Sequence, residues 1–143
     1  MDPDEPTGCV TFLVRHAWLS MRGALATALD EHGLSVQQYG TLLLVAAKPG
    51  STIAEVGREV GTARQSANEL IAGMERAGLV ERRANPSDRR TQQIHLTPAG
   101  EQRLADAVPA VRKVEAELEA SFTDADRAAA RAWLRHMVET LDG

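Results

Sequence analysis

One stretch of this chain constrains the fold more than any other. It runs from Gly61 to Gly100 and reads GTARQSANELIAGMERAGLVERRANPSDRRTQQIHLTPAG. Its first part has apolar residues at helical spacing, and a cluster of turn-forming residues then separates two short extended runs. A Thr-Pro pair follows, which is typical of the start of a helix. The stretch therefore predicts a β-hairpin between two helices.

The first helix of this stretch is expected to begin at Thr62 or Ala63, because Thr62 and Gln65 have the spacing of a capping box. Gly78 stands where a left-handed C-terminal cap is needed. Between these ends runs an apolar stripe that faces the core, formed by Ala67, Leu70, Ile71 and Met74.

Two strands are expected on either side of the turn residues 84–88. The first strand covers 79–83. In the second, over 92–97, apolar and polar residues alternate, which predicts one buried and one exposed face. The hairpin is basic, because it carries Arg82, Arg83, Arg89 and Arg90 against Glu81 and Asp88.

The polar face of the helix before the hairpin has side chains of the kind that read base edges in the major groove: Arg64, Gln65, Ser66 and Asn68. A solvated face is the simpler interpretation for a helix by itself. The cationic hairpin favours DNA instead, because a helix in the major groove and a basic finger along the phosphates or in the minor groove act together.

The segment from Gly78 to Gly100 resembles the wing of the MarR family of winged helix-turn-helix transcription regulators. The family pattern is GLV-x-R, a short turn, D-x-R and L-T-x-x-G, matched here by Gly78-Leu79-Val80, Arg82, Asp88, Arg90, Leu96-Thr97 and Gly100. The rest of the chain resembles the family more loosely, in length and helix order. The resemblance implies that Arg90 enters the minor groove, with Asp88 orienting it or its neighbour and Arg89 near phosphate. Arg82 completes the expected DNA contacts.

Three helices are expected before this stretch, over 9–31, over 36–47 and from 51 or 52 to 60. Gly33 ends the first and Ser35 caps the second. Thr52 and Glu55 have the spacing of a capping box for the third. The turn at Gly61 joins it to the next helix, which makes a helix-turn-helix.

Two helices are expected after the hairpin, from Pro98 to about Ala120 and from about Thr123 to the end. Pro109 falls inside the first of them and is expected to kink or split it. Thr123 and Asp126 start the last helix, whose buried side is expected to carry Ala130, Trp133, Leu134, Met137, Val138 and Leu141.

These elements predict a mainly α fold with a small β-hairpin wing (α+β), in a single domain over residues 1–143. A winged helix-turn-helix DNA-binding lobe covers 34–97, and a helical dimerisation region covers 9–32 and 98–142. Residues 1–8 are expected to form a loose acidic lead without the parts of a signal peptide. No apolar run reaches the roughly 18 residues of a membrane span, so we expect a cytoplasmic protein with no membrane partner.

The terminal helices carry apolar stripes that one chain of this size does not fill. The resemblance implies that they interlock with those of a second copy, and the homodimer then reads two half-sites of a palindromic operator about one helical turn, ~34 Å, apart. Packing of these helices on each other in a monomer is the alternative. The expected interface residues are Val10, Leu13, Val14, Ala17, Trp133, Leu134, Met137, Val138 and Leu141.

The net charge of -4 argues at first against a nucleic-acid partner. The charge is unevenly distributed, however. Residues 62–100 contain six arginines and four acids, a net charge of +2, which leaves -6 for the rest of the chain. A locally basic face on an acidic body still binds phosphates, so double-stranded DNA is the expected partner.

The resemblance also implies a small effector, often a phenolic or other aromatic acid, bound between the DNA-binding lobe and the dimerisation helices. Such a ligand would release a repressor by favouring a spacing of the two recognition helices that no longer matches the operator. The expected lining residues are Arg15, His16, Leu19 and Tyr39.

Other chemistry has little support in the sequence. There is no phosphate loop, nucleophile elbow or pair of carboxylates in an apolar setting, so we expect no enzyme, no catalytic residue and no cofactor. The four histidines are scattered, so we expect no metal site; they are His16, His32, His95 and His136.

Two alternatives stay open. Cys9, the one cysteine, cannot form an internal disulfide. As a thiol near a helix N-terminus it leaves open a redox-sensing regulator. The other alternative is a winged-helix module that binds a protein instead of DNA, which the arginine-rich hairpin disfavours.

Overall fold

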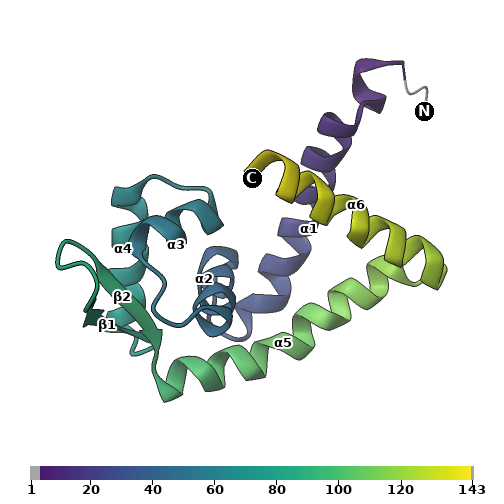
Figure 1. Cartoon of the computed structure of the whole chain (residues 1–143). Helices are drawn as coiled ribbons and strands as arrows, with labels where there is room; N and C mark the ends of the chain where they lie inside the picture. Colours follow the sequence, from purple (N-terminus) through teal and green to yellow (C-terminus); the bar gives the residue numbers. More distant parts are fainter. Residues whose placement is uncertain (1–3, 143) are drawn as a thin grey trace. The chain divides into compact units, whose positions relative to one another are not determined.

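A computed structural model describes residues 4–142 of the chain. Its mainly helical fold with one hairpin confirms the predicted fold class (Figure 1). The elements are η1 (Pro6–Gly8), α1 (Val10–Asp30), α2 (Val36–Ala47), α3 (Ile53–Val60), α4 (Arg64–Arg76), β1 (Val80–Ala84), β2 (Gln92–Leu96), α5 (Pro98–Glu119) and α6 (Asp124–Asp142). The expected acidic lead over residues 1–8 lies partly outside the described residues, and its described end contains η1.

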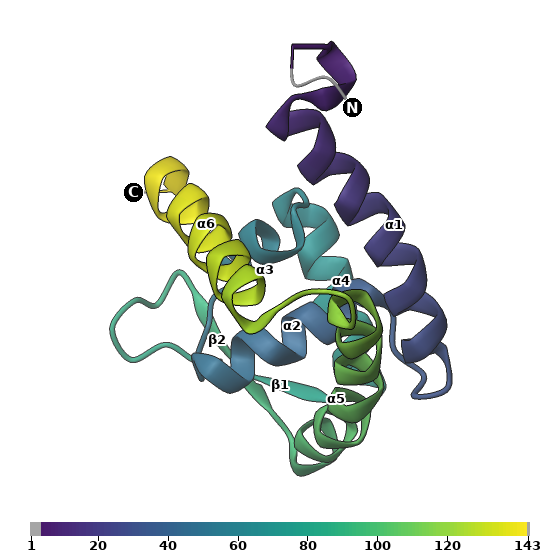
Figure 2. The ribbon, with the colours of Figure 1, turned by 90° about the vertical axis from the view of Figure 1, so that its right-hand side faces the viewer.

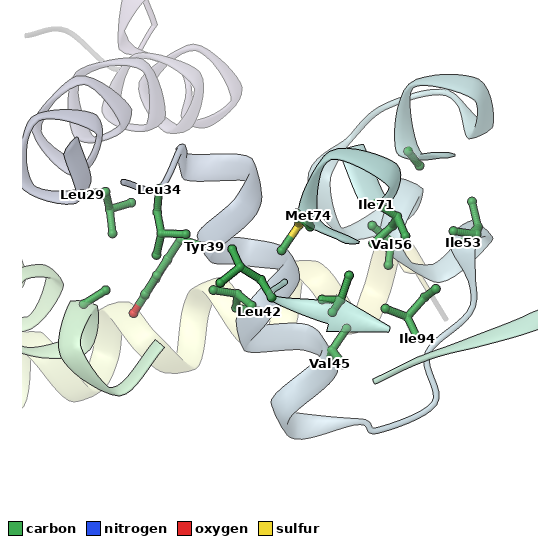
Figure 3. Packing of buried hydrophobic residues seen from close by; sticks show 14 of the residues in the cluster. Leu29, Leu34, Tyr39, Leu42, Val45, Ile53, Val56, Ile71, Met74 and Ile94 are labelled. Atoms are coloured by element: carbon green, nitrogen blue, oxygen red, sulfur yellow. The ribbon is translucent and has the colours of Figure 1, made fainter. Parts of the chain in front are cut away.

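The chain divides into two compact units at Val111 and Arg112. The first unit contains the hydrophobic core, which α2, α3, α4 and the hairpin enclose with the end of α1 and the first part of α5. Figure 3 shows the core side chains of α2, α4 and β2 directed toward one another. The fully buried large side chains include Leu29, Leu42, Val56, Ile71, Met74, Leu79 and Ile94.

The helix-turn-helix forms at Gly61, which ends α3 in the left-handed conformation with φ of +68°. The Thr62 N–H donates to the Gly57 carbonyl at 2.9 Å, so Thr62 belongs to the turn. The predicted capping box of Thr62 and Gln65 is therefore wrong. The N-cap of α4 is Ala63, and no side chain caps the helix there.

At the starts of α2 and α3 the observed capping is closer to the prediction. Ser35 and Gln38 form a full capping box at the start of α2. Thr52 Oγ1 accepts from the Glu55 N–H at 3.2 Å, which is half of the predicted box, while the Glu55 carboxylate pairs with Lys48 at 2.5 Å.

The hairpin pairs β1 with β2 in antiparallel register, with Arg82 opposite Ile94. Its first strand begins at Val80, one residue later than predicted. The reason is that Leu79 still completes α4: its N–H donates to the Met74 carbonyl at 2.9 Å, beyond Gly78 with φ of +75°. The loop between the strands projects from the helices α2 to α4 (Figures 1 and 2).

The start of α5 is locked to the end of α4. Thr97 Oγ1 donates to the Gly78 carbonyl at 2.5 Å and accepts from the Gly100 N–H at 3.0 Å. A side chain at Gly100 would place its Cβ 2.0 Å from the Leu79 carbonyl oxygen. The glycine of the L-T-x-x-G motif is therefore required by the close approach of two backbone segments.

The last helices agree only in part with the sequence predictions. Pro109 does not split α5, which continues unbroken to Glu119. The prolyl residue removes one helical hydrogen bond at a cost of about 3 kcal/mol. Ala107 and Val111, on either side of it, are buried in the core. Thr123 and Asp126 cap the start of α6 reciprocally at 3.1 and 3.2 Å, as predicted. No described residue of α6 is buried in the single chain, so its predicted buried side stays a prediction for the dimer.

Candidate nucleic-acid interface

The first turns of α4 present the predicted polar face to solvent. Ala67, Ile71 and Met74 are fully buried on one side and hold the helix against the core. The opposite side is exposed at Arg64, Gln65, Ser66 and Glu69, and Asn68 is half-buried at the edge nearest the hairpin. The buried stripe thus fixes which polar side chains are available to a ligand.

The tip of the hairpin is ordered by short-range hydrogen bonds. Asn85 Nδ2 donates to Thr91 Oγ1 at 2.8 Å across the base of the loop. Asp88 Oδ1 accepts from the Arg90 backbone N–H at 3.0 Å and from Arg90 Nε at 3.2 Å. The bond from the backbone N–H, and next the bond from the side chain, lower the pKa of the Asp88 carboxyl. The carboxylate therefore stays charged and holds Arg90, whose side chain remains 90 % exposed.

A cationic groove lies between α4, the start of α3 and the hairpin, with a volume of about 380 Å³. Its described lining contains four arginines and no acidic side chain. The N-terminus of α3 adds partial positive charge to the groove. The lining residues are Thr52, Ile53, Ala54, Arg64, Asn68, Arg82, Arg89, Arg90, Thr91 and Gln92.

Arg82 differs from the other three arginines of the groove. Its side chain is 22 % exposed, and Nε donates to Glu75 Oε1 at 2.7 Å. Nη1 donates to Asn68 Oδ1 at 3.3 Å. Arg82 thus joins the hairpin to α4 instead of extending toward solvent as Arg90 does.

Sequence reasoning missed Glu75 as part of this arrangement. Asn68 and Glu75 are seven residues apart, which places them two turns apart on one side of a helix. That spacing is visible in the sequence. Only the folded hairpin shows that Arg82 lies opposite both of them.

The residues predicted to line an effector site line neither the cationic groove nor a second hollow of the first unit. Arg15, His16 and Leu19 are exposed on α1, and Tyr39 on α2 is 9 % exposed within the core. The second hollow, of about 640 Å³, has a different lining, formed by Val45, Ala46, Pro49, Arg83, His95, Leu96, Glu101, Leu104, Ala105 and Val108.

The apolar residues predicted for a dimer interface are exposed in the single chain. On α1 they are Val10, Leu13 and Val14, each about 40 % exposed. On α6, Leu141 is 81 % exposed and Met137 is half-buried. Trp133, Leu134 and Val138 are between 50 and 59 % exposed. Large apolar side chains in such a row indicate a contact surface.

Cys9 is the N-cap residue of α1 and is exposed. Its Sγ lies 3.4 Å from Thr11 Oγ1 and donates to the Pro6 carbonyl at 2.9 Å. Hydrogen bonds to the sulfur, first from the Thr11 hydroxyl and then from the Phe12 backbone, lower the pKa of this thiol.

Among residues 4–142, no group of three or more metal-ligating side chains comes together. No helix in the described part is long and apolar enough to cross a membrane.

Comparison with known proteins gives related sequences. A model described as the MarR family matches residues 32–91. The transcriptional regulator HosA of Escherichia coli O111:H- is 36 % identical over 85 residues, which make up 59 % of this chain and 62 % of HosA. The chain thus spans less than two thirds of the length of the curated relatives that it matches first.

Solved structures extend the similarity over nearly the whole chain. The transcriptional regulator MOSR of M. tuberculosis, in complex with DNA, is 30 % identical with a TM-score of 0.73, covering 94 % of this chain and 96 % of MOSR. The repressor CouR bound to a 23-mer DNA duplex is 25 % identical with a TM-score of 0.82, covering 96 % and 98 %. CouR from Rhodococcus jostii RHA1 bound to p-coumaroyl-CoA is 26 % identical with a TM-score of 0.81, covering 94 % of each chain.

Proposed function

Because the chain belongs to the MarR family of transcriptional regulators, we propose that it is a homodimeric, sequence-specific DNA-binding repressor that a small ligand releases from its operator. The observation that carries this proposal is the groove lined by four arginines and no described acid, beside the exposed first turn of α4. DNA is the partner that places base edges and phosphates side by side at this spacing. The protein would act in the cytoplasm, without an enzymatic step.

The DNA contacts divide between α4 and the hairpin. Arg64, Gln65, Ser66 and Asn68 lie at or near the exposed start of α4 and would face base edges in the major groove. Arg90, held by Asp88 and 90 % exposed, would enter the minor groove, with Arg89 near phosphate. Arg82 would contribute through its protein contacts, because its guanidinium is already bonded to Glu75 and Asn68.

The exposed apolar rows on α1 and α6 support a homodimer. Burying a large apolar side chain gains roughly 1.5–3 kcal/mol, so a row of them stabilises association. Two copies of α4 related by a two-fold axis would read a palindromic operator. The interface would use Val10, Leu13, Val14, Ala17, Trp133, Leu134, Met137, Val138 and Leu141.

The proposed effector is a small aromatic acid or a derivative of one. Its support is that a relative, CouR, is bound to p-coumaroyl-CoA, the thioester of a phenolic acid. We place the site near Arg15, His16, Leu19 and Tyr39. Bound ligand would favour dimer states whose recognition helices no longer match the operator.

A second candidate function is redox sensing through Cys9, favoured by the exposed thiol and its lowered pKa. In that case oxidation, instead of a ligand, would release the DNA. A winged-helix module for protein binding is less consistent with the structure, since a groove lined by arginines suits phosphates.

A gel-shift experiment tests the proposed function. The purified chain is titrated onto DNA from the region upstream of its own gene and onto an unrelated duplex of equal length and base composition. The proposal predicts a shift of the upstream DNA at lower protein concentration. Equal affinity for both duplexes would contradict a sequence-specific repressor. If neither duplex were shifted, the protein-binding module would be favoured.

A further inference from the structure

We propose that Arg82 sets the base preference of Asn68, by turning its amide so that N–H donors face the DNA. Asn68 then selects guanine over adenine in the major groove. This inference rests on the proposed function, since it assumes that α4 reads DNA. In it Arg82 touches no DNA and is a positioning residue.

The orientation of the Asn68 amide follows from the chemistry of its neighbour. Arg82 Nη1 lies 3.3 Å from Asn68 Oδ1. A guanidinium has five N–H donors and no acceptor, so the Asn68 atom that faces it must be the oxygen. Its oxygen is directed toward the hairpin, and the half-buried Asn68 lines the groove; we infer that its NH₂ group is the part of the amide left for a ligand in the groove.

The guanidinium is itself held in place, so it fixes the amide instead of following it. Its Nε donates to Glu75 Oε1 at 2.7 Å, a charge-assisted bond in a half-buried setting. Gln92 Oε1, on the neighbouring strand, lies 3.5 Å from Nη1. Arg82 is thus anchored by Glu75 of the same helix that carries Asn68.

A fixed donor group has a defined preference among bases. The major-groove edge of guanine offers two acceptors, N7 and O6, whereas adenine offers the N7 acceptor beside the N6 donor. The paired contact of asparagine with adenine needs the amide oxygen as acceptor for N6. Here Arg82 occupies one lone pair of that oxygen and holds it toward the hairpin, so we infer that the N6 donor of adenine is matched less well than the two acceptors of guanine.

The experiment is selection of bound duplexes from a library with a randomised core, followed by sequencing. It compares the native chain with Asn68→Ala, Arg82→Met and the double variant. Asn68→Ala identifies the base pair that Asn68 reads, as the position where preference is lost. At that position the native chain is expected to prefer guanine. Arg82→Met frees the oxygen and is expected to shift the guanine-to-adenine ratio toward adenine by about fivefold or more.

A further variant, Arg82→Met with Glu75→Gln, leaves no unpaired carboxylate and is expected to show the same shift. This second variant can still be measured if Arg82→Met alone folds poorly. In the Asn68→Ala background, Arg82→Met is expected to change no base preference. A purely structural role of Arg82 would weaken all sites alike without moving the preference at one position.

Three results would overturn the inference while leaving the proposed function intact. The first is a native preference for adenine at the Asn68-dependent position. The second is an unchanged guanine-to-adenine ratio both in Arg82→Met and in Arg82→Met with Glu75→Gln. The third is an Asn68→Ala profile identical to the native one. A native chain that selects no sequence at all would instead contradict the proposed function.

Discussion

Asp88 accepts two hydrogen bonds from Arg90, from its backbone N–H at 3.0 Å and from its Nε at 3.2 Å. The first fixes the loop at the tip of the hairpin, and the second fixes the start of the guanidinium. The two Nη groups stay outward on a side chain that is 90 % exposed. In the proposed DNA complex, Asp88 would therefore orient the arginine that meets the DNA.

Replacement of Asp88 separates this orienting role from simple charge. Asp88→Ala removes a negative charge, which by long-range electrostatics alone would raise the affinity for DNA. We expect the affinity to fall by roughly two- to tenfold instead, because an unheld Arg90 loses more rotamer freedom on binding. Fluorescence anisotropy titrations on the upstream DNA measure the affinity of Asp88→Ala relative to that of the native chain.

The matched control is Glu81→Ala. It removes one negative charge from the same hairpin and frees Arg83, to which Glu81 is paired on the exposed strand. Its affinity is expected to be unchanged or higher. If both variants strengthened binding equally, Asp88 would have no orienting role.

Gly100→Ala tests the close approach of α5 to the end of α4. A Cβ there lies 2.0 Å from the Leu79 carbonyl oxygen, so backbone must move. We expect a loss of about 3 kcal/mol in the free energy of unfolding, measured by urea denaturation. Gly23→Ala in α1 is the control, since nothing lies within 4 Å of its Cβ and helix propensity favours alanine by about 0.5–1 kcal/mol. Equal stability of the two variants would contradict this explanation of the L-T-x-x-G motif.

The homodimer is tested on α6. Leu134 is 50 % exposed in the single chain, and Leu134→Asp would bury a carboxylate in the proposed interface. We expect the dimer to weaken by about 3 kcal/mol, measured by sedimentation at micromolar concentration. Ala132→Asp introduces the same charge on the opposite face of the helix and should leave the dimer intact. A native chain that sediments near 15.4 kDa would rule out the dimer and the palindromic operator.

Peroxide treatment distinguishes the two release mechanisms. If an aromatic acid is the effector, such a ligand weakens operator binding and raises the melting temperature of the free protein. Peroxide then has no effect on DNA binding. Loss of DNA binding on peroxide treatment, absent from Cys9→Ser, would instead favour redox sensing through this exposed thiol.

Much of the fold was accessible from local signals. The bounds of α2, 36–47, were predicted from its apolar pattern and from Ser35, which caps its start. The buried stripe of α4 followed from spacing at Ala67, Ile71 and Met74. The capping box predicted at Thr62 was wrong because two local signals compete there: the Thr62 N–H donates to the Gly57 carbonyl within the turn at Gly61, so Thr62 does not cap α4.

The residues of the candidate site also divide into those predicted from the local sequence and those whose role depends on the folded hairpin. The exposed arginines of the hairpin tip, Arg89 and Arg90, were predicted from turn residues, charge and the family resemblance. The role of Arg82 was not, because it depends on which side chains of α4 lie opposite β1 once the hairpin has folded. The exposed row on α6 likewise has no partner to identify it within the described chain, so its burial stays a prediction.

The central claim is that α4 reads sequence while the hairpin binds the DNA backbone and minor groove. Its most direct test is a salt series of binding titrations on upstream and random A·T-rich DNA. Arg90→Ala is expected to weaken both complexes and to flatten the log–log salt dependence by about one unit per lost contact per subunit. Gln65→Ala is expected to cost roughly 1–3 kcal/mol on upstream DNA with little change on random DNA. Arg112→Ala, an exposed arginine of α5 outside the groove, controls for charge. An Arg90→Ala slope equal to that of Arg112→Ala, together with an unchanged upstream-to-random ratio in Gln65→Ala, would contradict the account.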